Sequence, residues 1–264
     1  MISSYFDEEY PKSLQLIENP PIGLFIKGNM LFNELEDSIS IIGTRNPTYY
    51  GHTKARTIAR AMAENGYIVL SGLARGIDIE AHLGTLEGGG ITIAVLGSGV
   101  ENVYPAEHKN VAEEIIKEGA LISELYIDQR ISKFSLINRN RIVSGLSKAS
   151  LIIEGNLNSG TRHEARFAKA QNKYIFALKP KDLNNENSKL PIELIKSNAV
   201  EIETASDILN YLISRDSKIN TTESRPILIT DYLILEENNE RREFKKNHYP
   251  IPRLIDKYIK STGI

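Results

Sequence analysis

The chain has 264 residues, a formal net charge of −2, 41% hydrophobic residues and no cysteine. This length and apolar content predict one large α/β domain with appendages, or two small domains. The lack of cysteine excludes disulfides, thiolate metal sites and a cysteine nucleophile, and it favours a cytoplasmic protein. No apolar run approaches the roughly 20 residues that span a bilayer, so we expect no membrane partner. The polar, acidic start of the chain is unlike a signal peptide.

The predicted elements alternate between short apolar strands and helical segments. Residues 1–37 include Pro11, Pro20, Pro21 and Gly23, and this composition predicts a small N-terminal cap. Strands are then predicted at 38–43, 67–72, 91–97, 120–124, 150–155 and 174–178, and helices at 51–65, 77–87, 107–118, 137–147 and 161–172. The strands are rich in Ile, Val and Leu, which is typical of strands covered on both faces. The alternation predicts a doubly wound, mostly parallel, Rossmann-like α/β sheet over residues 38–213.

Residues 214–264 are expected to form a C-terminal extension of unclear fold. The stretch LITDYLILEEN fits either a strand or a helix, and the charge run EENNERREFKKN indicates a solvated surface.

Polar, glycine-rich loops follow the predicted strands, where ligands of open parallel sheets bind. They comprise Gly43, Thr44 and Arg45 after the first strand, Ser71, Gly72, Arg75 and Gly76 after the second, Gly97 and Gly99 after the third, and Ser159, Gly160 and Thr161 after the fifth. Glycine lets backbone N–H groups approach an anion, and Arg offers a planar fork for two phosphate oxygens. Any one of these glycines alone would indicate only a tight turn. Together they predict a phosphate site, in which Asp78 caps the next helix or orients Arg75.

A basic segment adds to this prediction. No acid lies between Asp128 and Glu154, and the helix there includes Asn138, Arg139, Asn140 and Arg141. Its arginines are candidates for phosphate contacts, with surface charge as the alternative. Tyr104 and Phe134 are candidates for stacking on bases, although packing explains them equally well. The five histidines lack metal-ligand spacing, so we expect no metal and no cofactor.

These motifs resemble one known family. IIGTRNPTYYG, SGLARGIDIEAHLGTLEGGGITIAVLGSGVENVYPAEH, GALISEL and FSLINRNRIVSGLSKASLIIEG are similar to the DNA-processing protein A family (DprA or Smf), over roughly residues 8–212. The resemblance implies a non-catalytic homodimer that binds single-stranded DNA in a basic pocket and loads a RecA-type recombinase during recombination or DNA uptake. It also implies that the residues named above in the first three loops and the Asn138–Arg141 segment line this pocket. If Arg45, Arg75, Arg139 and Arg141 each neutralise one phosphate, log affinity falls with log salt at a slope of about −3.

Two departures leave alternatives open. Residues 159–165 read SGTRHEA, which resembles the GTxxE element of nucleotide phosphoribohydrolases; this implies an N-glycosidase with Glu164 as its catalytic carboxylate. The other interpretation of Glu164 is an acid favoured by a helix N-terminus. A nucleotide-sensing module that uses the same pocket is a third possibility. The tail after residue 213 does not show the winged-helix pattern of many family members.

Overall fold

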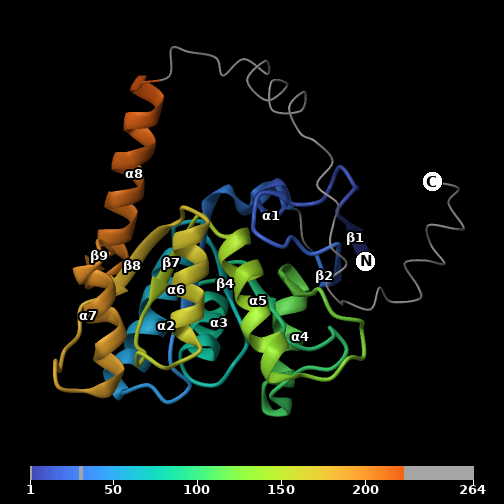
Figure 1. The fold of residues 1–264 in the computed structure, drawn as a ribbon, viewed down its shortest axis with the longest axis horizontal. Helices are drawn as coiled ribbons and strands as arrows, with labels where there is room; N and C mark the ends of the chain where they lie inside the picture. The colour runs from blue at the N-terminus through green and yellow to red at the C-terminus, as the bar shows by residue number, and fades with distance from the viewer. Residues whose placement is uncertain (1, 30–31, 223–264) are drawn as a thin grey trace, which may run out of the picture. The chain divides into compact units, whose positions relative to one another are not determined.

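A computed structural model describes residues 2–29 and 32–222 and shows the expected alternation of strands and helices (Figure 1). The strands are β1 (Ile2–Ser4), β2 (Gly23–Gly28), β3 (Ser38–Ile42), β4 (Ile68–Ser71), β5 (Thr92–Val95), β6 (Ala120–Ser123), β7 (Ala149–Ile152), β8 (Tyr174–Leu178) and β9 (Val200–Ile202). The α-helices are α1 (Lys12–Gln15), α2 (Tyr49–Glu64), α3 (Ile77–Glu87), α4 (Lys109–Glu118), α5 (Lys133–Leu146), α6 (Thr161–Ala170), α7 (Lys189–Lys196) and α8 (Ala205–Thr222), and the 3-10 helices are η1 (Phe32–Asp37), η2 (Ala106–His108) and η3 (Glu186–Ser188). Every strand and helix predicted from the sequence is present, with its ends shifted by a few residues at most.

The nine strands form one mostly parallel sheet, so the predicted fold class is confirmed. Their order is β1-β2-β6-β5-β4-β3-β7-β8-β9, and only β1–β2 and β2–β6 pair antiparallel. The chain places β4, β5 and β6 successively on one side of β3, and then returns to place β7 on the other side. The direction of winding therefore reverses between β3 and β7, and this is the point where open α/β sheets form their ligand crevice.

Helices cover both faces of the sheet, which explains the continuous apolar strands. One core cluster joins the sheet to α1, α5 and α6 through residues such as Leu14, Val143 and Ala165. The other joins it to α3 and α4 through residues such as Ile79 and Ile115. Figure 1 shows α5 and α6 on the near face, with α2 and α3 behind them.

The N-terminal residues are part of this sheet. β1 and β2 extend it beyond β6, and the side chains of Leu24 and Tyr10 are buried. The Tyr10 hydroxyl donates a hydrogen bond to Pro21 O at 2.6 Å, which fixes the turn before β2. The expected boundary between residues 37 and 38 therefore lies inside one sheet.

The chain divides into two units, Met1–Asn210 and Tyr211–Ile264. Residues 223–264, which include most of the expected C-terminal extension and its charge run, lie outside the described residues. In the described part of the chain, no helix combines the length and apolarity needed to cross a membrane.

Candidate functional site

The loops that follow β3 and β4 pack backbone against backbone at the carboxyl edge of the sheet. Ile77 N donates to Thr44 O at 3.2 Å, which joins the start of α3 to the loop after β3. Gly76 has a φ of +77° and lies so close to this loop that a Cβ would overlap Thr44 O. Glycine is required here for both reasons. The structure thus brings the predicted residues of the first two loops together.

Arg139 lies inside the protein beneath this edge. Arg139 is 6% exposed, and its guanidinium Nη1 donates a hydrogen bond to Val95 O at 2.7 Å. A Cβ on Gly72 would occupy the position of this guanidinium, so Gly72 is the residue that makes room for it. Because the Arg139 side chain is buried in the core, its guanidinium is not accessible for the phosphate contact that the sequence predicted.

Asp78 holds the turn that carries Arg75. It is 4% exposed, and its carboxylate accepts backbone hydrogen bonds from Ala74 and Gly72. Burial raises the pKa of Asp78, while Arg139 and these two hydrogen bonds counteract the rise. The expected cap of α3 is not formed, since no side chain caps this helix. The carboxylate of Asp78 binds the backbone of the turn and faces the charge of Arg139, whereas the Arg75 guanidinium bonds Glu107.

Glu164 is fully buried in the same interior. Its Oε1 lies 3.5 Å from Ser40 Oγ, which in turn donates to Ser150 Oγ at 2.8 Å. Burial raises the pKa of Glu164 to about 8 against the opposing effect of Arg139, so the group is mostly protonated at neutral pH. Glu164 lies in the first turn of α6 as expected, but not as a solvated acid stabilised by the helix dipole. It also has no access to a substrate, which removes the catalytic carboxylate that an N-glycosidase needs.

Arg141 links α5 to Glu124 and to the N-terminal region by hydrogen bonds. Its Nη1 and Nη2 atoms donate to the Glu124 carboxylate at 2.7 and 2.6 Å, and its Nε donates to Asn19 O at 2.8 Å. Because this side chain is buried and all three nitrogens are engaged, the phosphate contact expected of Arg141 is not available either. Its neighbour Asn140 is also buried, and its Nδ2 donates to Gly160 O at 3.3 Å. The half-buried Asn138 accepts from Arg141 Nη1 through its carbonyl at 2.9 Å.

At most of the predicted loop glycines, other atoms of the protein fill the space that a side chain would need. A Cβ on Gly43 would overlap Ile77, one on Gly97 would contact Leu136 at 3.1 Å, and one on Gly99 would overlap Tyr126 O. The N–H of Gly99 is already engaged by Gln129 O at 2.8 Å. Around Gly160 alone among these glycines, a Cβ would meet nothing within 4 Å. The hydroxyl groups of these loops bond to the protein itself. Ser71 Oγ donates to Ile41 O, and Ser159 Oγ donates to Asn156 O. Thr44 Oγ1 accepts from Asn46 N, and Thr161 is buried.

A protein carboxylate fills the anion position at the start of α2. Glu154 Oε2 accepts from Thr48 N at 2.8 Å, and Oε1 accepts from Thr48 Oγ1 at 2.5 Å. Thr48 Oγ1 in turn accepts from Gly51 N at 3.1 Å, and a Cβ on Gly51 would overlap the Glu154 carboxylate. In dinucleotide-binding folds the first strand-to-helix turn receives the phosphate. Here Glu154 occupies that position, which argues against a free nucleotide bound at this helix.

Two exposed cations follow β3 and β4 at this edge, Arg45 and Arg75. Arg45 makes no hydrogen bond or ion pair with the residues that the structure describes. Arg75 donates to Glu107 through Nε at 2.7 Å and Nη2 at 2.6 Å, and this hydrogen-bonded pair raises the pKa of Arg75. The side chains of both partners are more than half exposed, so water competes with the pair and an anion is able to replace Glu107.

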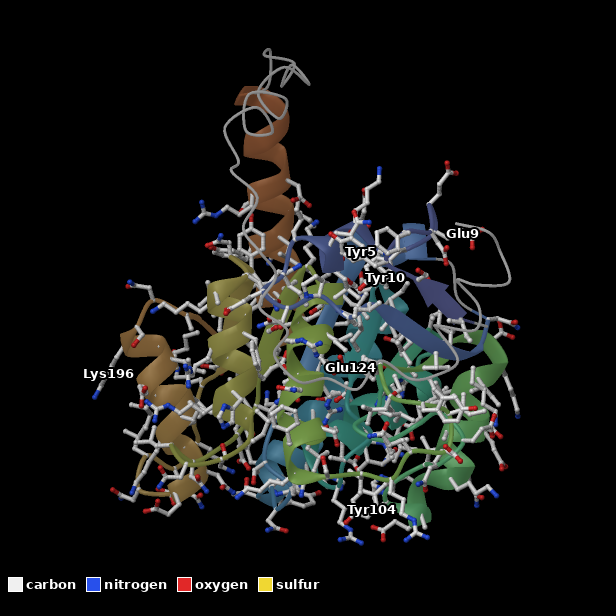
Figure 2. All side chains as sticks on the ribbon, turned by 45° about the vertical axis from the view of Figure 1, so that its right-hand side comes forward. Tyr5, Glu9, Tyr10, Tyr104, Glu124 and Lys196 are labelled. Atoms are coloured by element: carbon white, nitrogen blue, oxygen red, sulfur yellow. The ribbon has the colours of Figure 1, made fainter. Side chains whose placement is uncertain are left out.

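Exposed aromatic and basic side chains extend this row across the neighbouring strands. Tyr104 follows β5 and is 47% exposed, and Phe134 in the first turn of α5 is 62% exposed beside the exposed Lys133. Figure 2 shows Tyr104 at the opposite end of the molecule from Tyr5 and Glu9. The strand order places these groups one after another along the edge, and β3 to β6 spans about 15 Å at the usual strand spacing. We call Arg45, Arg75, Tyr104, Lys133 and Phe134 the edge track.

Comparison with known proteins adds a family to this geometry. Residues 1–213 match the family model described as DNA recombination-mediator protein A. The chain belongs to this family. It is 35% identical over 209 residues to the DNA processing protein DprA of Bacillus subtilis, which covers 79% of this chain and 70% of that protein. It is also 36% identical over 207 residues to the protein Smf of Escherichia coli, covering 78% of this chain and 54% of that protein. The match thus spans about half the length of the E. coli protein.

Two solved structures of family members share the fold. The DNA processing protein A of Streptococcus pneumoniae superposes with a TM-score of 0.75 and 30% sequence identity, over 80% of this chain and 73% of that chain. The DNA processing protein A of Helicobacter pylori superposes with a TM-score of 0.72 and 32% identity, over 81% of this chain and 97% of that chain. A single-stranded DNA binding mode is described for the H. pylori protein.

Sequence reasoning did not identify Glu154 and Glu107, whose hydrogen bonds fix Thr48 and Arg75 at this edge. The acid Glu154, which directly follows an apolar strand, and the Thr48–Gly51 spacing after β3 together signal an internally capped helix. Glu107, the partner of Arg75, carried no comparable signal because its loop is remote in sequence. The buried Asp78 and Glu164 share core positions with apolar residues of their helices.

The buried carboxyl of Glu164 gives the fold a pH dependence. Its pKa is raised from 4.5 to about 8, so the folded state binds more protons than the unfolded state between these values. Stability contributed by this group is therefore lost as the pH rises from about 4.5 towards 8, with about 1 kcal/mol lost between pH 7 and pH 9. Gln resembles the protonated form, so Glu164→Gln should be the more stable protein at pH 9 and show a flatter pH profile.

Urea unfolding at pH 5, 7 and 9 measures this difference. Glu113→Gln, which alters an exposed carboxylate on α4, is the matched control and should follow the wild type. Parallel pH profiles for the wild type and Glu164→Gln would show that Glu164 ionises in the folded protein as it does in the unfolded chain.

Proposed function

We propose that this family member binds single-stranded DNA along the edge track and does not act on it chemically. The observation that carries the proposal is the combination, on one edge, of exposed cations with exposed aromatic rings. Arg45, Arg75 and Lys133 suit phosphates, and Tyr104 and Phe134 suit the faces of unpaired bases. A duplex hides those base faces, so the rings favour a single strand. The single-stranded DNA binding mode described for the H. pylori relative supports the same assignment.

The absence of catalysis is part of the proposal and rests on how the carboxyl groups near the edge are used. Glu164 is buried and mostly protonated, and Glu154 caps the region at the start of α2. Glu107 is exposed but paired with Arg75. In the protein without DNA, none of these three is a free carboxylate beside the edge track. A strand bound there meets cations and rings, which hold it without cleaving it.

We extend the proposal to the family's described role in recombination. A homodimer that holds single strands in the cytoplasm and delivers them to a RecA-type recombinase is consistent with the description of the matching family model. This extension depends on family membership, whereas DNA binding depends on the edge track. A recombinase-loading assay on strands coated with single-strand binding protein tests it, and no stimulation by the wild type would reject it.

Two variants should move DNA affinity in opposite directions. Arg45→Ala removes an accessible cation and should weaken binding to oligo-dT and reduce the size of the salt slope by about 0.7. Glu107→Gln releases Arg75 from its partner and should strengthen binding. The wild-type slope should be about −2, from Arg45, Arg75 and Lys133, instead of the −3 expected when Arg139 and Arg141 were counted. Fluorescence anisotropy across a salt series provides both quantities.

The matched control is Lys196→Ala. Lys196 is an exposed cation in the last turn of α7, towards the other end of the sheet (Figure 2), and its loss should leave affinity and slope nearly unchanged. A duplex of the same sequence should bind more weakly than the single strand. Equal binding of duplex and single strand, or an Arg45→Ala slope equal to that of the wild type, would contradict the proposed function.

A further inference from the structure

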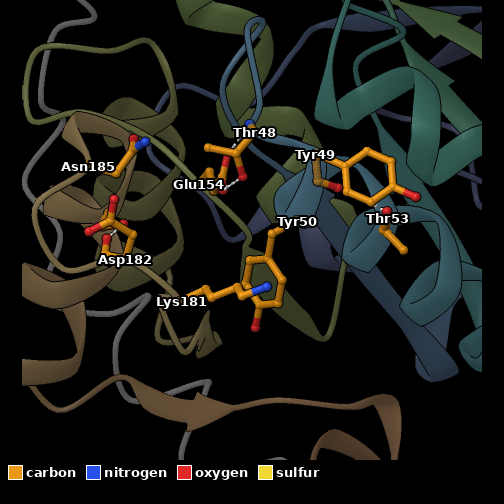
Figure 3. Close-up of a pocket in the computed structure, with 9 residues that line it drawn as sticks. Thr48, Tyr49, Tyr50, Thr53, Glu154, Lys181, Asp182 and Asn185 are labelled. Atoms are coloured by element: carbon orange, nitrogen blue, oxygen red, sulfur yellow. Dashed lines mark hydrogen bonds between the residues drawn. The ribbon is translucent and has the colours of Figure 1, made fainter.

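A pocket of about 540 Å³ lies next to the edge track, and no residue predicted from the sequence lines it. It forms between the start of α2 and the loop that follows β8, and Figure 3 shows Thr48, Tyr49, Tyr50, Glu154, Lys181 and Asp182 around it. Asn187 Nδ2 donates to Asn46 O at 2.9 Å, so the loop after β8 is tied to the loop that carries Arg45. The strand order β4-β3-β7-β8 therefore continues the row of Arg75 and Arg45 into this pocket.

The charged side chains that line the pocket are two carboxylates and one cation. Asp182 Oδ1 accepts from Asn184 N at 2.9 Å, and within the described residues Asp182 Oδ2 has no hydrogen-bond partner. Glu154 contributes a second carboxylate to the wall. The one cation of the lining, Lys181, is exposed and makes no ion pair with the described part of the chain. Two acids against one cation disfavour a phosphate inside the pocket but suit a group that donates hydrogen bonds.

Aromatic rings form the opposite side. Tyr49 is 88% exposed, and the neighbouring Tyr50 is fixed by a hydrogen bond from its hydroxyl to Lys179 O at 3.1 Å. Lys54 Nζ lies 5.7 Å from the Tyr50 ring centroid. A fixed ring and a freely exposed ring beside a carboxylate acceptor form a site for a flat ligand with an amino group. The volume is within the range of pockets that hold ligands of this kind.

We propose that this pocket holds one base of the bound strand, a base with an exocyclic amino group, whose N–H donates to Asp182. The amino group of cytosine donates to carboxylates in protein–DNA contacts, whereas thymine presents a carbonyl in the same place. Lys181, at the rim, contacts the phosphate of that nucleotide, and as a fourth cation it changes the expected salt slope for a strand that fills the pocket from about −2 to about −3. This inference rests on the proposed function, because the base reaches the pocket only from a strand on the edge track. Contacts to phosphates do not distinguish one base from another, so this pocket would add a base preference to the binding.

The test compares oligo-dC with oligo-dT at pH 7.5, with single strands of equal length and anisotropy as the readout. The wild type should bind oligo-dC about fivefold more tightly than oligo-dT. Asp182→Asn keeps an oxygen for Asn184 N but places an amide donor where the free oxygen was, so it should abolish this preference. Lys181→Ala should weaken binding of both strands and leave their ratio unchanged.

Asp128→Asn is the matched control. It removes one exposed negative charge from the loop between β6 and α5, near the other end of the edge track, and should change affinity for both strands by the same factor. A dC to dT ratio that is the same in the wild type and Asp182→Asn would reject the base pocket, even where Arg45→Ala still weakens binding. Failure of the wild type to bind either strand would instead reject the proposed function itself.

Discussion

The carboxyl edge of this sheet depends on one buried guanidinium. Arg139 reaches from α5 to Val95 O at the end of β5 and occupies the space that Gly72 leaves free after β4. A buried charge is tolerated only where hydrogen bonds and opposite charge compensate for lost water. Asp78 supplies that charge from α3 while its carboxylate also holds the turn after β4. The end of β5 and the turn between β4 and α3 are thus fixed against a single side chain from α5.

This interior explains how the edge presents its recognition groups. The N–H groups of Gly72 and Gly99 are bound by Asp78 and by Gln129 O, so these two are not available to a ligand, and exposed side chains contribute to recognition. Loops that are already ordered lose little conformational freedom when a ligand binds. The same principle applies at the start of α2, where Glu154 occupies the anion position of the first turn. Under the proposed function, the ligand therefore lies across side chains of several loops, and no single turn holds it by one phosphate group.

The sequence predicted the fold, because apolar strands that alternate with helices specify a parallel sheet. It also placed the candidate site at the carboxyl edge, because ligand loops follow the carboxyl ends of parallel strands. Arg45 and Arg75 were chosen by that position alone; both are exposed there, and their contact with phosphate stays a prediction. The base-stacking role of Tyr104 and Phe134 stays a prediction, but their exposure leaves both rings accessible.

The sequence interpretation failed where polar residues occupy core positions. Arg139 shares the spacing i, i+3, i+4 and i+7 with Ile142, Val143 and Leu146, which is one face of a helix. Glu164 likewise lies on the buried face of α6 with Thr161, Ala165 and Ala168. Helical periodicity thus contained the information that both side chains point inward. It was outweighed by the rule that Arg and Glu are almost never fully buried unless they are paired, and the pairing depends on contacts remote in sequence.

The most direct test of this account is a crystal structure of the protein with a short oligo-dT strand. We expect phosphate oxygens within hydrogen-bond distance of the guanidinium groups of Arg45 and Arg75, with Glu107 displaced and the guanidinium of Arg139 still bonded to Val95 O. A phosphate bound to the guanidinium of Arg139, with that bond to Val95 broken, would contradict the division of the edge into an internal scaffold and an exposed binding surface.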